Sequence, residues 1–519
     1  MVKHLKLFLL FLCFCQSVSI QASVQETLPS WHWSIPIIEE LKLQTNLNTL
    51  TFLNQPFRRG EIAKVLIEIK KDESLSLSQQ AIDLIALLEK EFKPEMDQIL
   101  NADKPNEIAL GLNVAENVGN FESDTDVKGI YRSRVNVALG NHLAAHNSVV
   151  INQFLVDDTL YIGKQWRGMV AYNEQAYVTW QASSFLIKFG RDWLQWGAGR
   201  HGTLFFSDVA RPMDQLLIKG NLANLTYTFL FSQLDDIRTG DDSLSAVYKR
   251  YISAHRLNAS FFEGKLQCAV TEALLYSGEN RSVDLNYLNP FLIYYGAQIN
   301  RKDKANMFLC MDLLYQPTIH TELYASLLID DIQVEKTGPG DLEPNEIGWI
   351  AGGRYANPFN VEGLVLGLEY SRVSNRTYKT PSPWETVIHR NQPLGHPLGN
   401  DFDFLCMDLS QWIGLNLNVG MHVSMIRKGE GSIYTEWDAP WMNYTVEQGY
   451  SEPFPAGVVE TRKEFGLSAK YYPSTHWGLE GEMNLINRDN ADHMEGVSKS
   501  DNTWKIGFWW QGDIRVKSL

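Results

Sequence analysis

Apolar and polar residues alternate one by one through most of the chain after about residue 108. In 413–425 every odd position is apolar, and the even positions are Gly, Asn, His or Ser. Side chains with a period of two lie on opposite faces of a β-strand, and this run is longer than a typical strand of a soluble protein. Tilted strands that cross a membrane have this length. The pattern therefore predicts membrane-spanning strands with one lipid-facing side.

The second face of these strands carries charges. Arg132 and Arg134 share one face of a predicted strand, as Glu480 and Glu482 do in another. Charges on this face are tolerable only in a water-filled or mutually paired lumen. A soluble β-sandwich shows the same alternation in any single strand. Many such strands, with long polar loops at alternate ends, instead favour a mainly β fold, a transmembrane antiparallel β-barrel over 106–519.

Loop lengths indicate the number of strands. Bacterial barrels keep short turns in the periplasm and long loops outside, with both chain ends in the periplasm. Following the chain with this rule gives an even number, about eighteen strands, provided that 285–303 does not span the membrane. We therefore expect 285–303 to belong to an external loop or to fold into the lumen. Long polar connections are expected near 118–126, 193–211, 234–245, 276–304, 330–346, 374–401, 429–460 and 489–501.

A different period precedes the barrel. In 62–69 apolar residues recur at i, i+3, i+4 and i+7, the spacing of one helical face, and a similar stripe occupies 81–92. Ser34 and Pro36 make a helix start before another apolar run. Three amphipathic helices can bury their stripes against one another. We therefore predict a small N-terminal helical module over 30–100, located in the periplasm.

The chain starts with two basic residues, a short apolar run and a small-residue region. Lys3 and Lys6 precede the apolar run 7–15, which is too short to cross a bilayer as a helix. This layout is typical of a secretory signal peptide over 1–22, cleaved after Ala22. Export together with a membrane barrel places the protein in the cell outer membrane.

Composition argues against several classes of function. The net charge of −15 argues against binding nucleic acid by charge alone. Removing the signal peptide leaves Cys268, Cys310 and Cys406, which are too few and too scattered for a disulfide framework. The sequence contains neither a CxxC pair nor an HExxH motif, so no metal site and no cofactor are predicted.

The most distinctive motif is the run 190–200, which reads Gly-Arg-Asp-Trp-Leu-Gln-Trp-Gly-Ala-Gly-Arg. Gly197 and Gly199 allow backbone turns that are closed to other residues. Four side chains offer aromatic stacking faces or planar hydrogen-bond donors: Arg191, Trp193, Trp196 and Arg200. Such groups suit sugar rings and acidic sugars. The simpler interpretation is a strand end with an interfacial aromatic girdle and a tight loop, and both interpretations stay open.

Two of the long predicted loops are rich in aromatic residues. The loop 374–400 contains Trp384, and the loop 429–460 contains Trp437, Trp441 and Tyr444. Exposed aromatic side chains in long loops are typical of carbohydrate-binding surfaces. They also allow loops to pack on each other and to plug a lumen, and the sequence does not separate the two roles.

The acidic pair Asp330 and Asp331 follows a predicted strand. Paired carboxylates can share a proton in glycosidases or bind Ca²⁺. Neighbouring residues in a strand point to opposite sides, so we expect loop capping or charge pairing here rather than catalysis. The G-x-S-x-G elbow of serine hydrolases is missing from the sequence. The protein is therefore not expected to be an enzyme.

Several ordered motifs resemble the capsule assembly protein Wzi family. The run 190–207 resembles the GRD…WG-x-G…L…S signature, and 56–63 resembles the P-x-x-R-x-E-I-A segment that precedes many such barrels. The residues that match family motifs are Gly190, Gly197, Gly199, Ser207, Asn289, Pro290, Asp330, Asp331, Glu369 and Tyr370. The resemblance implies an outer-membrane barrel of about eighteen strands that acts as a surface lectin without catalysis.

Sequence pattern and resemblance together predict a surface lectin that anchors or organises capsular or extracellular polysaccharide. The predicted partners are surface polysaccharide, outer-membrane lipid and, through the helical module, peptidoglycan. A sugar-selective outer-membrane porin is the alternative, because the lumen face is polar and the loops are aromatic. An outer-membrane enzyme would need several carboxylates or a Ser–His pair that converge in one pocket.

Overall fold

The computed structural model describes residues 24–517. The described range has gaps at 46, 48, 73–76, 102–105, 122–123, 141, 162, 240–245, 302–304 and 415. The predicted signal peptide, 1–22, lies outside the described residues.

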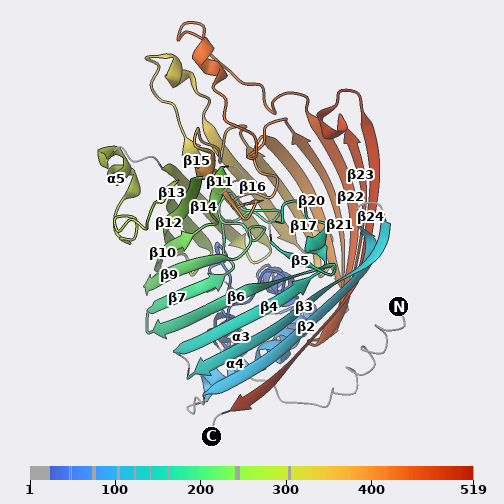
Figure 1. Ribbon diagram of the computed structural model, residues 1–519. Coiled ribbons are helices and arrows are strands. Elements are labelled where there is room, and N and C mark those ends of the chain that lie inside the picture. The colour runs from blue at the N-terminus through green and yellow to red at the C-terminus, as the bar shows by residue number, and fades with distance from the viewer. Residues whose placement is uncertain are drawn as a thin grey trace.

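The described chain forms a closed antiparallel barrel (Figure 1). Twenty strands of the described residues belong to this sheet, but β5 (Gln165–Trp166) and β11 (Ile237–Thr239) are short and lie within connections. The eighteen long strands are β2 (Glu107–Phe121), β3 (Asp124–Leu139), β4 (Leu143–Asn152), β6 (Met169–Ala182), β7 (Phe185–Asp192), β9 (Met213–Leu222), β10 (Leu225–Gln233), β12 (Ala246–Phe261), β13 (Leu266–Glu279), β14 (Asn306–Thr318), β15 (Thr321–Asp331), β16 (Glu346–Ala356), β17 (Leu364–Val373), β20 (Phe402–Ile413), β21 (Leu417–Lys428), β22 (Glu460–Ser474), β23 (Trp477–Asp489) and β24 (Ser498–Lys517). Pairing of β2 with β24 closes the barrel, so the predicted strand number and fold class are confirmed.

Short turns join the strands at one end of the barrel, here called the turn end, and long loops join them at the other, the loop end. In Figure 1 the loop end is at the top. The outer wall is apolar: Ile108, Leu110 and Leu112 of β2 are 48%, 50% and 42% exposed, and they alternate with side chains that face inward. This is the alternation that a lipid-facing wall requires.

The three predicted helices are present as α2 (Ser34–Leu41), α3 (Arg59–Lys71) and α4 (Gln79–Leu100). Ser78 starts α4, where its hydroxyl accepts a hydrogen bond from the backbone N–H of Ala81 at 3.1 Å. α4 contains Pro94 and continues to Leu100. Among the residues that the structure describes, no helix is both long enough and apolar enough to cross a membrane.

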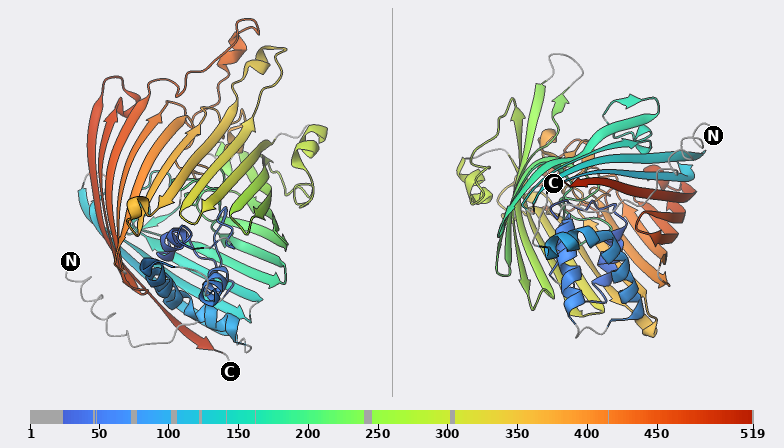
Figure 2. Two further views of the ribbon diagram at one scale, coloured as in Figure 1. Left: turned by 180° about the vertical axis from the view of Figure 1, so that it is seen from behind. Right: turned by 90° about the horizontal axis from the view of Figure 1, so that it is seen from below.

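The helical module fills the turn end of the barrel (Figure 2). Trp33 stacks on Trp509 of β24, with ring centroids 6.1 Å apart. The apolar core that the helices form with one another is continuous with inward side chains of the wall. These wall residues are Ala269, Leu314, Trp412, Tyr472 and Trp509. The module thus has its core in common with the barrel, while its predicted periplasmic location remains a prediction.

Buried charges fix the position of the module. Lys42, which follows α2, forms an ion pair with Glu322 of β15, and both side chains are almost fully buried. Glu322 also binds Arg354 of β16 at 2.8 Å. Burial lowers the pKa of Lys42 to about 8, and the Glu322 carboxylate opposes this shift. One carboxylate is therefore shared by two cations, one from the module and one from the wall.

We predict that Glu322→Leu will destabilise the docked state far more than Lys42→Met. Removing Glu322 leaves Lys42 and Arg354 buried without a counter-charge, which costs about 3–5 kcal/mol. Removing Lys42 leaves Glu322 paired with Arg354, so a smaller loss is expected. The loss would be measured as the free energy of unfolding in urea, with protease cleavage near the helices as a separate readout of undocking. Equal losses in the two variants would contradict the shared role of Glu322.

Candidate functional site

The motif region after β7 folds into the lumen. Its strand β8 (Gln195–Trp196) pairs with β1 (Asn54–Gln55), which precedes α3. The backbone N–H of Gly197 donates to the carbonyl oxygen of Leu53 at 3.1 Å. Trp196 is only 4% exposed, and the Arg256 guanidinium lies 5.4 Å from its ring centroid. The motif therefore joins the helical module to the inner wall.

Glycines let this region coil tightly. Gly197 and Gly202 adopt φ of 136° and 144°, a region that favours glycine. A side chain on Gly199 would lie 2.0 Å from the carbonyl oxygen of Gly202. Gly202 in turn lies against His396, whose pKa burial lowers to about 3, so that this histidine stays neutral. These positions require glycine for structural reasons.

Glu369 of β17 holds the coil in place. Its buried carboxylate accepts hydrogen bonds from the backbone N–H groups of Arg200 and His201 at 2.7 and 3.2 Å. It also accepts one from the Tyr324 hydroxyl at 2.9 Å. The Arg200 side chain binds Glu39 of α2 at 2.8 Å. Glu369 therefore joins the motif to the barrel wall, and Arg200 joins the motif to the helical module.

A second apolar core fills the lumen above the module. Ser207 connects the two luminal loops, because its backbone N–H donates to the carbonyl oxygen of Leu394 at 2.8 Å. Side chains of 193–211 and 374–401 meet inward residues of the wall there. The buried members include Leu194, Leu204, Phe205, Phe206, Ile252, Phe308, Ile350, Tyr378, Val387 and Leu394. We call the helical module with these two loops the plug.

Three other residues of the 190–200 motif, Gly190, Arg191 and Trp193, lie in different environments. Arg191 points outward and forms an ion pair with Asp214 at 2.5 Å. Gly190 adopts φ of 124° beside the backbone of β6. Trp193 is half-buried and faces a small cavity next to the module. The structure therefore does not gather Arg191, Trp193, Trp196 and Arg200 around one open surface.

The two carboxylates of the acidic pair engage different partners. Asp330 accepts the backbone N–H of Tyr378 at 2.6 Å and so holds the 374–401 loop. Asp331 accepts the backbone N–H of Ile332 and the side-chain amide of Gln333, both at 2.8 Å. Each carboxylate thus fixes a loop.

The segment 285–303 contains α5 (Tyr294–Arg301) and forms no membrane-spanning strand in its described part. It belongs to a connection at the loop end, which agrees with the expectation of a loop rather than a strand. The other expectation, folding into the lumen, is wrong: the hydroxyl of Tyr227, on the outward face of β10, donates to the carbonyl oxygen of Pro290, the residue after Asn289. Tyr370 also faces outward and donates to Asp403 at 3.2 Å.

An aromatic cluster forms the rim at the loop end. Arg376 lies 4.3 Å from the ring centroid of Trp441 and 5.2 Å from that of Trp437. Trp441 is 3% exposed, whereas Tyr444 is 42% exposed. Trp384 stacks on Tyr248 at 3.9 Å. The rim therefore combines aromatic residues that hold the loops together with others that face solvent, Tyr444 above all.

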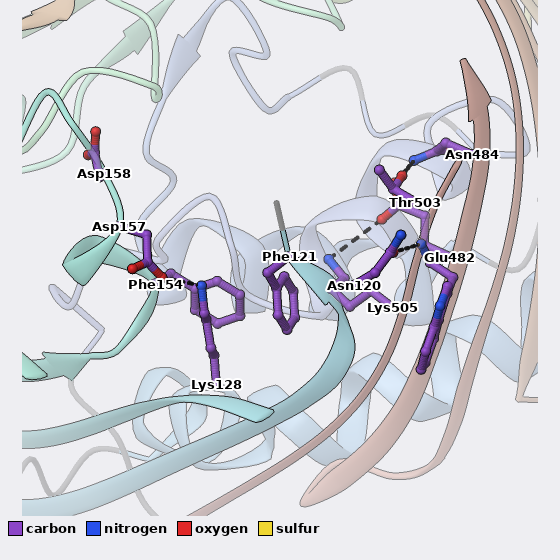
Figure 3. A pocket seen from close by; sticks show the side chains of 11 residues that line it. Asn120, Phe121, Lys128, Phe154, Asp157, Asp158, Glu482, Asn484, Thr503 and Lys505 are labelled. Carbon is purple, nitrogen blue, oxygen red and sulfur yellow. Dashed lines mark hydrogen bonds and ion pairs between the residues drawn. The ribbon is translucent and has the colours of Figure 1, made fainter. Parts of the chain in front are cut away.

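A cavity of about 440 Å³ opens beside the rim, between the loop ends of β2 and β3 and the middle part of β23 and β24 (Figure 3). Phe121 and Phe154 meet edge to face at 5.2 Å, and Lys128 lies 5.0 Å from the Phe121 ring while it pairs with Asp157. The opposite side is polar, with Glu482, Asn484, Thr503 and Lys505. Aromatic faces opposite hydrogen-bonding groups suit a sugar unit.

Sequence reasoning missed this cavity, because its residues come from both ends of the barrel region and no local motif connects them. It also missed His201, Cys406 and Asp408, whose potential metal-binding atoms lie within 4.8 Å of one another. Asp408 hydrogen-bonds to His201 at 2.8 Å and to Cys406 at 3.6 Å. These hydrogen bonds explain why the three side chains lie together, and no metal ion is needed.

The fold is similar to that of solved outer-membrane proteins. Wzi from Escherichia coli, described as an outer-membrane protein involved in group 1 capsule assembly and as a carbohydrate-binding β-barrel, matches with a TM-score of 0.58 at 14% identity, over 95% of this chain and 99% of that chain. OccD3 and OprD from Pseudomonas aeruginosa match with TM-scores of 0.45 and 0.46 at 10% and 11% identity, each over 78% of this chain and over 91% and 95% of their own. No curated protein matches the chain's sequence.

The model of the family described as capsule assembly protein Wzi matches residues 114–503. This range contains almost the whole barrel and each of the motif residues from Gly190 to Tyr370. Because the match spans most of the chain, the protein belongs to the capsule assembly protein Wzi family and is located in the outer membrane.

Proposed function

We propose that the protein is a non-catalytic surface lectin that holds or organises capsular or extracellular polysaccharide at the loop end of the barrel. The observation that carries the proposal is the cavity beside the rim, where the aromatic rings of Phe121 and Phe154 face the polar side chains of β23 and β24. A sugar unit presents one apolar face and several hydroxyl groups, so it needs this combination of partners. The E. coli relative is itself described as carbohydrate-binding.

The ligand-contacting groups that we propose differ from part of the sequence-based set. Trp196 is buried in the plug, and Arg200 binds Glu39, so both have structural roles here. Tyr444 and the half-buried Trp437 remain candidates, because they lie on the solvent side of the rim. The proposed surface therefore extends from the cavity to the rim. The proposed absence of catalysis is supported by the acidic pair, because each of its carboxylates holds a loop.

We further propose that the helical module meets the cell wall on its exposed side. Between α3 and α4 lies a groove of about 480 Å³, with Met96 and Leu100 among its apolar residues. Four lysines border the groove, Lys70, Lys71, Lys90 and Lys93, and they outnumber its two acidic residues, Glu89 and Asp97. Lys70 forms an ion pair with Glu89 at 3.1 Å. Peptidoglycan carries free carboxylates, which would be attracted to such a border in a salt-dependent way.

Deleting the gene should move polysaccharide from the cell-bound to the shed fraction, because the proposed anchor is lost. Both fractions would be quantified after gentle centrifugation. Complementation with Thr503→Trp, which fills the cavity, should restore retention poorly. Asn502→Trp is the matched control, since it adds the same ring one residue away on the outer face of β24. An unchanged ratio in the deletion strain would contradict the lectin function.

The full-length protein should conduct little current in planar lipid bilayers, because the plug occupies the lumen. Single-channel recording, with an open general porin as the positive control, tests this. Stable openings of porin size would contradict a plugged barrel. They would favour the alternative, a sugar-selective porin.

Replacing the four groove lysines with glutamine in the full chain should reduce co-sedimentation with purified peptidoglycan. The reduction should shrink as salt is raised, because screening already weakens the wild-type contact. The same substitution at Lys463 and Lys499, which lie at the loop end, serves as the control. Equal sedimentation of all three proteins would rule out the groove as the contact.

A further inference from the structure

Part of the connection between β13 and β14 lies on the outside of the barrel. Residues 280–301, here called the outer-wall segment, descend from the loop end along β12, β13 and β14 and end in α5. Figures 1 and 2 both show α5 beside the wall, away from the lumen. The segment contacts residues at mid-height: Glu272, which hydrogen-bonds to the start of α5, is in the middle of β13.

The underside of the segment is tightly packed on the wall. Tyr287 and Tyr294 are fully buried against Leu274 and Tyr276, which are themselves fully buried although they belong to the outward face of β13. The Tyr294 ring meets His255 of β12 edge to face at 4.0 Å. This part of the wall is thus covered by the protein's own chain.

The backbone of the segment finds its hydrogen-bond partners within the protein. The Glu272 carboxylate accepts the N–H groups of Tyr294 and Tyr295, at 3.1 and 2.9 Å. The Tyr251 hydroxyl donates to the carbonyl oxygen of Arg281 at 3.2 Å. Turns of the segment satisfy further N–H groups, among them those of Tyr287, Leu288, Asn289, Leu292 and Ala297. Non-helical backbone is tolerated at membrane depth only where protein covers it and supplies its hydrogen-bond partners, and the wall and the turns supply these partners here.

The outer side of the segment presents large apolar side chains that are unusually exposed, next to the exposed amides of Asn286 and Asn289. Leu285, Phe291, Ile293 and Tyr295 are 80%, 82%, 70% and 59% exposed. The stretch 285–300 contains no Asp, Glu, Lys or Arg. Neighbouring outward residues of the wall, Leu257 and Val270, are also apolar and exposed, at 47% and 48%. The segment therefore continues the lipid-facing surface rather than interrupting it.

We propose that the outer-wall segment is inserted in the membrane and binds the acyl chains of outer-membrane lipid through Leu285, Phe291 and Ile293. Three observations support this occupant: the segment reaches the middle of β13, many of its backbone N–H groups are hydrogen-bonded within the protein, and its stretch 285–300 contains no charged residue. Glu272 is a positioning residue, since its carboxylate caps α5 and is shielded from lipid by the segment. A charge on the lipid-facing wall is otherwise costly at this depth.

Spin labels test the insertion in the full chain, reconstituted in phosphatidylcholine vesicles. Cys268→Ser removes the most accessible native thiol, and a nitroxide is then attached at Phe291→Cys. Relaxation by oxygen, which concentrates in lipid, should exceed relaxation by a water-soluble nickel complex, as it should for Val270→Cys on the wall. Met442→Cys, 56% exposed in a loop-end loop, is the aqueous control and should show the opposite ratio.

Two outcomes would overturn the proposal. A label at Phe291 that behaves like the one at Met442 would place the segment in water. Spin–spin broadening that disappears on dilution with unlabelled protein would show that a second copy of the chain covers the surface. Glu272→Leu should in addition make the label at Phe291 more mobile than Glu272→Gln does, because glutamine keeps a carbonyl acceptor for the start of α5.

Discussion

An eighteen-strand barrel is too wide for its inward side chains to meet across the lumen. Every inward side chain must therefore face water or be covered by a segment of the chain that folds into the lumen. This constraint explains most of the structure. The helical module covers the inward side chains at the turn end. The loops 193–211 and 374–401 cover those between the module and the loop end. The module cannot be regarded as a separate unit, because wall residues such as Trp412 and Trp509 complete its core.

Buried polar groups fix the position of the plug inside the barrel. Apolar contacts alone would tolerate many positions of a helix inside a wide barrel, whereas a buried carboxylate requires particular donors. Glu369 accepts the backbone N–H groups of Arg200 and His201 at the end of the motif. Glu322 binds one cation from the module and one from the wall, and Arg256 donates to the carbonyl oxygen of Leu53. Displacing the module or the motif would take a hydrogen-bond or ion-pair partner away from each of these buried groups, although each keeps a partner on the wall. The plug is therefore held in one position.

The repeating parts of this fold could be predicted from sequence, and the destinations of its loops could not. The alternation of apolar and polar residues indicates which residues face lipid, and so it predicts the strands. Loop length predicts the number of strands and the absence of a strand at 285–303. Helical stripes likewise indicate α2 to α4. Trp196 looks the same in sequence whether it faces a sugar or is buried, because the answer depends on its pairing with Asn54, more than a hundred residues away. The cavity between β2, β3, β23 and β24 depends in the same way on closure of the barrel.

Filling one part of the lumen also determines where a ligand can bind. The apolar part of the plug lies against β7 to β20, whereas the wall from β21 through β24 to β4 keeps polar inward side chains such as His422, Glu482 and Lys505. In the proposed function, an extended polysaccharide does not thread the plugged barrel, and its contacts lie at the loop end. There the cavity lies over the polar part of the wall and the Arg376 cluster forms the rim over the plug. The rigid plug would thus support the loops from below, and a sugar chain could bind across the cavity and rim without ordering them first.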